Sequence, residues 1–111
     1  MSDGITVGTV FRVPLGDGTT GMGQAVAVEG AVVAIALGDV IWDCDPGLLD
    51  WQQCGRALTH LPLRADALAG VVPVGEALVE PASVADHARW QAGDRAVVGA
   101  PPAVVLRALL S

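Results

Sequence analysis

Three apolar segments follow one another at the spacing of β-hairpins, and they constrain the fold of this chain more than any other feature. Residues 5–15 alternate in side-chain character with a period of two, which is typical of a β-strand with two distinct faces. Residues 16–18, Gly-Asp-Gly, tolerate positive φ and favour a turn into a return strand over residues 22–29. Residues 31–37 are apolar at both alternating positions, which predicts a strand covered on both faces. The segments together predict an antiparallel meander that curls into a small barrel.

The residues after this meander predict a short helix. Residues 38–43 either extend the third strand after a bend or form a fourth strand. Asp45 is expected to cap the helix, with Pro46 in its first turn. Four residues then fall on one helical face: Leu48, Trp51, Gly55 and Leu58. Glycine is a weak helix former, so the helix is expected to end early.

Further strands are predicted in the second half of the chain, and they are shorter. Residues 63–64 and residues 69–78 have strand character, interrupted at Pro62 and at Pro73. Proline cannot donate a hydrogen bond to a neighbouring strand, so at least one of these segments is expected to be an edge strand or bulged. A last strand is predicted over residues 95–98.

The C-terminal region predicts one more helix. Residues 83–91 fit neither pattern clearly, whereas Pro101 can begin a short terminal helix. Four apolar side chains of this helix are expected to pack inward: Val105, Leu106, Leu109 and Leu110. Arg107 is expected to face water. The whole sequence predicts a single domain over residues 1–111 of the α+β class, mainly β. The architecture expected is a small curled antiparallel sheet or partly open barrel with one or two short helices.

Composition limits the class of partner. The chain has 111 residues, twelve acidic side chains and six basic ones, and a net charge of −6. Nucleic acid is not an expected ligand, because phosphate binding requires a basic surface. A protein partner with a basic surface is the better electrostatic match. The start of the chain lacks a secretory signal, and the longest apolar stretch, residues 31–37, is too short to cross a membrane. We therefore expect a cytoplasmic protein that does not bind membranes.

The residue types that carry chemistry do not form a recognisable motif. Cys44 and Cys54 are separated by nine residues, which does not match the close pairs of zinc sites. No metal and no cofactor are therefore predicted. Either cysteine could be paired with His60 or His87 and an acid as a nucleophilic site, but no local signature supports that pairing. The expectation is that the chain is not an enzyme.

An acidic segment with tryptophans is the first candidate for a binding surface. Asp43, Asp45 and Asp50 flank Trp42 and Trp51. Helix capping and a solvated face would explain these residues without any function. An anionic surface with an aromatic anchor, suited to a basic protein, explains them equally well. The predicted partner-binding residues are therefore Asp43, Asp45, Asp50 and Trp51, followed by Asp17, Thr19 and Thr20 in the first turn.

The strand-turn-strand pattern at the start of the chain resembles the opening of the immunity protein 26 family of bacterial polymorphic-toxin systems. The resemblance lies in residues 8–18, GTVFRVPLGDG, and in residues 21–26, GMGQAV, where Met22 replaces the usual aromatic residue. Near the C-terminus, Trp90 and residues 97–101, VVGAP, resemble the Trp-hydrophobic-Ile-Gly-x-Pro ending of the family, with a longer Trp-to-Gly spacing. The resemblance carries over no catalytic residue.

The resemblance implies a non-enzymatic immunity protein that binds and neutralises a cognate secreted toxin. Two hypotheses from other classes stay open. One is a small enzyme or ligand-binding barrel that uses Cys44, Cys54 or His60, and a concave pocket with converging polar groups around them would favour it. The other is a homo-oligomeric structural subunit, such as a homodimer, because a chain with 52% hydrophobic residues could bury an additional face.

Overall fold

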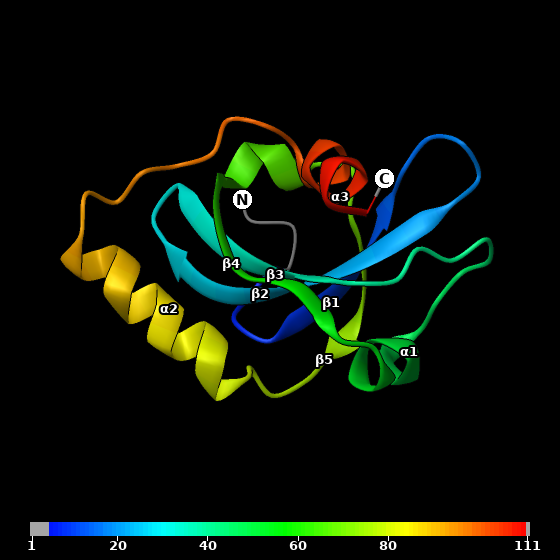
Figure 1. Ribbon diagram of the computed structural model, residues 1–111, viewed down its shortest axis with the longest axis horizontal. Coiled ribbons are helices and arrows are strands. Elements are labelled where there is room, and N and C mark those ends of the chain that lie inside the picture. The colour runs from blue at the N-terminus through cyan, green and yellow to red at the C-terminus, as the bar shows by residue number, and fades with distance from the viewer. Residues whose placement is uncertain (1–4, 111) are drawn as a thin grey trace.

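The computed structural model describes residues 5–110 and contains one curled sheet with helices packed around it (Figure 1). The elements are β1 Thr9–Pro14, β2 Thr20–Glu29, β3 Val32–Gly38, α1 Leu48–Gln53, β4 Arg56–Arg64, the 3-10 helix η1 Ala65–Leu68, β5 Val72–Glu76, α2 Pro81–Ala92 and α3 Pro102–Leu110. The strand order is β4-β3-β2-β1-β5, and every neighbouring pair is antiparallel. The predicted α+β class, mainly β, is confirmed, and the sheet stays open at β4 and β5.

The predicted meander corresponds to β1, β2 and β3. Gly16 and Gly18 have φ of 85° and 87°, so the predicted turn uses the left-handed region that glycine adopts without strain. β1 begins at Thr9 and not at Ile5, because the backbone turns at Val7 and Gly8. The alternating pattern therefore begins four residues before the strand that forms in the structure.

The sheet buries side chains on both faces. Eleven residues form the larger cluster: Phe11, Val13, Leu15, Ala25, Val33, Ile35, Leu37, Leu61, Leu63, Leu68 and Leu106. Six form the cluster on the other face: Val10, Met22, Val26, Ala34, Ala36 and Trp51. Consecutive residues of β3 alternate between the two clusters, which confirms that this strand is covered on both sides. Leu68 and Leu106 close the first face, and Trp51 of α1 closes the second.

A buried amide ties β2 to the segment that leads into α2. Gln24 is almost fully buried, and its Nε2 donates a hydrogen bond of 2.7 Å to the carbonyl oxygen of Ala77. A buried amide requires such a partner, since an unsatisfied donor would cost about 1–3 kcal/mol. Gln24 therefore fixes the chain between β5 and α2 against the middle of the sheet.

The predicted helix after residue 45 is shorter and begins later than expected. Residues 39–47 form a loop, and Gly38 is the last residue of β3. Asp45 is exposed and does not cap α1, because Gly47 is the N-cap residue. Asp50 performs the capping instead, since its Oδ2 accepts a hydrogen bond of 2.7 Å from the Gly47 amide. The chain becomes extended at Cys54, so Leu58 lies in β4 and not on the helix.

The two proline-containing segments form the two edges of the sheet, which agrees with the prediction that at least one of them is an edge strand or bulged. Pro62 lies in β4 and Pro73 in β5, and these strands are the first and last in the order. The pairing of β1 with β5 also shifts register between Val10 and Phe11. β4 spans nine residues, whereas the sequence predicted only its last two, because partial burial along most of its length weakens the alternation.

After β5, the described residues as far as Leu110 contain two helices and no further strand. Residues 83–91 lie within α2, which resolves their ambiguous pattern. The predicted strand over residues 95–98 is wrong, since Arg95 has a φ of 54° and only Val98 forms a bridge, with Leu63. The terminal helix is confirmed as α3. Leu106 is its buried contact, while Leu109 is 43% exposed and does not pack inward as predicted.

We predict that Gly23→Ala destabilises the fold by about 1–3 kcal/mol, the usual range for overpacking. A Cβ at Gly23 would lie 2.7 Å from Cε1 of Phe11 and 3.0 Å from the carbonyl oxygen of Ala36. Equilibrium denaturation measures the effect. Gly99→Ala is the matched control, because a Cβ there meets no atom within 4 Å. Equal denaturation midpoints for the two variants would contradict the prediction.

Candidate protein-binding surface

The two segments that the sequence predicted as contact residues lie beside each other. The amide of Thr20 donates to the carbonyl oxygen of Trp42, and the amide of Trp42 donates to that of Thr20, both at 2.8 Å. This bridge joins the β1–β2 turn to the β3–α1 loop, and Figure 1 shows both at the same end of the molecule. We call residues 16–20 and 39–45 the anionic end.

The anionic end combines free carboxylates with apolar side chains. Asp43 and Asp45 are exposed, and neither forms a hydrogen bond or ion pair with the rest of residues 5–110. Val40 and Ile41, in the same loop, are 37% and 36% exposed. Asp39 is fixed instead, because its Oδ1 accepts a hydrogen bond of 3.0 Å from the Gly55 amide. An apolar centre beside unpaired charge is an arrangement typical of protein-binding surfaces.

The β1–β2 turn is held by its own polar side chains. Oδ1 of Asp17 accepts hydrogen bonds from the amide and from the hydroxyl of Thr19, the former at 3.0 Å. The side-chain hydrogen bond from Thr19 is the largest cause that lowers the pKa of Asp17, and its backbone amide is the next. Arg107 of α3 adds a smaller effect from 3.4 Å. Thr19 therefore orders this turn, while Thr20 contributes its backbone to the bridge.

Two predicted contact residues have structural roles. Trp51 is 1% exposed, so it is not available as an aromatic anchor and we remove it from the predicted surface. The guanidinium of Arg56 covers Trp51, at 3.6 Å from the centroid of the Trp51 ring. Nε of the same arginine lies 2.7 Å from Oε1 of Glu80. Asp50 is half-buried and caps α1. Trp42 lies in the loop before α1 and is half-buried, a degree of burial that the sequence does not predict.

The cysteines and histidines do not meet in the way the enzyme hypothesis required. Cys44 is exposed and Cys54 is half-buried, and both are free thiols. Burial raises the pKa of the Cys54 thiol, which reduces its reactivity as a nucleophile. His60 forms its hydrogen bond with His87 and not with either thiol. Within residues 5–110 no group of three or more histidine, cysteine or acidic side chains is placed to hold a metal ion.

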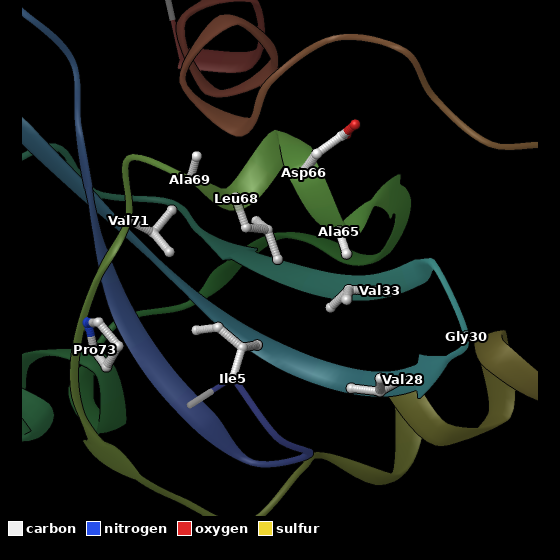
Figure 2. Close-up of a pocket in the computed structure, with 10 residues that line it drawn as sticks. All are labelled: Ile5, Val28, Gly30, Val33, Ala65, Asp66, Leu68, Ala69, Val71 and Pro73. Atoms are coloured by element: carbon white, nitrogen blue, oxygen red, sulfur yellow. The ribbon is translucent and has the colours of Figure 1, made fainter. Parts of the chain in front are cut away.

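A separate apolar cleft of about 310 Å³ lies between the curled sheet and η1. Figure 2 shows that the side chains of Ile5, Val33, Leu68 and Val71 line it, while the carboxylate of Asp66 is directed away. Neither cysteine and neither histidine lines this cleft, so it is not the pocket around Cys44, Cys54 or His60 that the enzyme hypothesis named. Its walls can enclose an apolar group by excluding water. The sequence did not predict it, because the cleft depends on how the sheet curls.

Comparison with protein-family models, with curated proteins and with solved structures finds no match for this chain. Among residues 5–110, no helix is both long enough and apolar enough to span a membrane. The fold defines an α+β protein with an open five-stranded antiparallel sheet.

We predict that Asp17 titrates below the ordinary range for aspartate and that Thr19→Val raises its pKa. Because the folded pKa is lowered, Asp17 stabilises the fold above its unfolded pKa, and this contribution is lost as the pH falls through the folded value. Carboxyl carbon chemical shifts followed by NMR during an acid titration measure the change. Thr6→Val is the control, since Thr6 contacts Thr9 and Glu76 instead. An unchanged Asp17 titration in Thr19→Val would contradict the prediction.

Proposed function

We propose that this chain is a non-enzymatic immunity protein, which binds a cognate secreted bacterial toxin and neutralises it by covering its surface. The observation that carries the proposal is the backbone bridge between Thr20 and Trp42. It joins two anionic segments that are distant in the sequence, and it leaves Asp43 and Asp45 exposed and unpaired beside them. The anionic end is the surface through which we expect the toxin to bind.

Electrostatics supports a basic partner. The net charge of −6 gives the whole molecule an attractive field for a basic protein, and free carboxylates at one end direct the encounter. Three of the six arginines are engaged near this end: Arg12 with the Pro46 carbonyl, Arg56 with Trp51, and Arg107 with Asp17. Their charges are held in internal contacts, so they do not neutralise Asp43 or Asp45 directly.

Apolar contact and rigidity support a stable complex. Val40 and Ile41 offer apolar area that a partner can bury, at about 25 cal/mol per Å². The bridge at Thr20 and the hydrogen bonds of Asp17 order both segments before binding. A preformed surface loses less conformational entropy on association than a flexible one, so a larger part of the contact energy appears as affinity. The immunity role itself draws on the family resemblance of residues 8–18 and 21–26.

The apolar cleft supports a second candidate function, the binding of a small apolar ligand. Its volume of about 310 Å³ lies at the lower end of the range for ligand pockets. This version of the barrel hypothesis does not use Cys44, Cys54 or His60, because none of them lines the cleft. A ligand there would be enclosed by Leu68 and Val71 and would leave the anionic end free.

The test of the proposed function is association with the toxin domain encoded next to this chain. A stable complex at micromolar concentration is expected, and its absence would overturn the proposal. Asp43→Lys with Asp45→Lys should slow association about tenfold at low salt and should reduce its dependence on salt. Surface plasmon resonance or stopped-flow fluorescence at several salt concentrations gives both quantities.

The matched control carries the same change in charge at other exposed acids. Asp66→Lys with Asp94→Lys alters the net charge from −6 to −2, as does the pair at the anionic end, since each substitution adds two charges. We expect this control to retain most of the association rate. Equal slowing by both pairs would show that net charge alone governs binding and would remove the anionic end from the interface.

A further inference from the structure

A chain of three titratable side chains joins α2 to the sheet. His60 of β4 lies with its Nε2 2.9 Å from Nδ1 of His87 on α2. Nε2 of His87 lies 2.5 Å from Oε2 of Glu29, at the end of β2. Trp90, one turn further along α2, stacks on His87 with ring centroids 5.3 Å apart. We call His60, His87 and Glu29 the histidine clasp.

The hydrogen bonds of the histidine clasp limit the number of protons that it can hold. A carboxylate only accepts, so Nε2 of His87 must carry a hydrogen toward Glu29. Nδ1 of His87 then either accepts from Nε2–H of His60, with both rings neutral, or donates to Nε2 of His60, with His87 cationic. If both rings are cationic, two N–H groups face each other and the hydrogen bond between the rings is lost.

The surrounding charges leave little to stabilise a second cation. Glu29 already accepts a hydrogen bond of 2.6 Å from Gln91 and lies 3.7 Å from Arg95. The nearby acid on α2, Asp86, is engaged by the Thr59 hydroxyl and by Arg89. No other ion pair involves the clasp within residues 5–110. A proton on each ring would therefore place two like charges against a single carboxylate.

Partial burial of the two rings further limits the number of protons that the histidine clasp can hold. The side chain of His87 is 12% exposed, and His60 is half-buried between β4 and α2. Burial is the largest cause that lowers the pKa of His60, and the neighbouring His87 is the second. A histidine whose folded pKa is lowered stabilises the fold above its unfolded value, near 6.5, and this contribution is lost as the pH falls. The hydrogen bonds from His87 and Gln91 lower the pKa of Glu29, so that carboxylate titrates in a separate and more acidic range.

We propose that the histidine clasp is a proton-sensitive lock, which holds α2 against the sheet at neutral pH and releases it when both rings become cationic. The lock lies on a different part of the molecule from the anionic end and does not depend on the proposed function. On release, the hydrogen bond between β4 and α2 through the rings breaks, and the contact between the rings of Trp90 and His60, whose centroids lie 5.9 Å apart, is lost. α2 is then held only by its remaining contacts, such as the hydrogen bond between Thr59 and Asp86.

Native-state hydrogen exchange followed by NMR tests the lock. Amide protection in α2 is compared with that in β3 at about pH 7.5 and about pH 5.5, after correction for the intrinsic exchange rate. In the wild-type chain, protection of α2 relative to β3 should fall about tenfold at the lower pH, because the hydrogen bond between the two rings is lost there. The chain has two histidines, and both belong to the clasp, so this pH range isolates it.

Two variants separate the lock from general loosening of α2. In His60→Gln, the amide Nε2–H can still donate to His87 but cannot gain a proton, so α2 protection should become almost independent of pH. In Thr59→Val, loss of the bond to Asp86 should lower α2 protection equally at both pH values and leave the pH dependence intact. The same tenfold fall in His60→Gln, or no fall in the wild-type chain, would overturn the proposal.

A second measurement on the wild-type chain does not depend on the folding of any variant. Ring ¹⁵N chemical shifts of His60 and His87 report which nitrogens carry hydrogen at each pH. We expect loss of α2 protection to coincide with protonation of the second ring. Two cationic rings with α2 still fully protected would overturn the proposal.

Discussion

The close contact between Phe11 and Gly23 is the interaction on which the rest of this structure depends. These residues are directly paired across β1 and β2, and the ring occupies the space that a side chain at residue 23 would need. The contact fixes the register of the first hairpin, since a slip by one residue would turn every side chain to the opposite face. With that register, Thr20 is the first residue of β2 and meets Trp42, so the geometry of the anionic end follows from packing in the core.

Local sequence patterns identified the elements whose environment is uniform along their length. The first three strands and the turn at Gly16 and Gly18 were predictable, because alternation and glycine placement are local properties. β4 and α2 were not, because each is only partly buried, and β4 is the edge strand against which α2 packs. Their partial burial weakens the periodic signal on which a reading of the sequence depends.

The sequence predicted only part of the candidate surface, because local patterns indicate some of its residues and not others. Exposure of Asp43 and Asp45 agrees with the acidic run, whereas Asp50 caps a helix that begins later than the sequence predicted, and Trp51 is buried by tertiary contacts. Asp50 faces the Gly47 amide only because α1 begins there, and Trp51 is covered by an arginine from the following strand. The pairing of His60 with His87 spans 27 residues and had no local signal at all. Composition indicated an anionic protein, and only the fold shows which carboxylates remain unpaired.

The buried amide of Gln24 has a consequence for the mechanics of α2. It anchors the backbone at Ala77, and the ion pair between Arg56 and Glu80 anchors the residue immediately before the helix. The contacts of His87 and Trp90 with His60 lie seven and ten residues further along, in the second and third turns of α2. Loss of those contacts would leave the beginning of the helix attached to the sheet, and the hydrogen bonds of Asp86 and Gln91 would limit how far the rest of the helix can move away. The helix would return to the same position on the sheet without diffusing away from it, because its beginning stays attached.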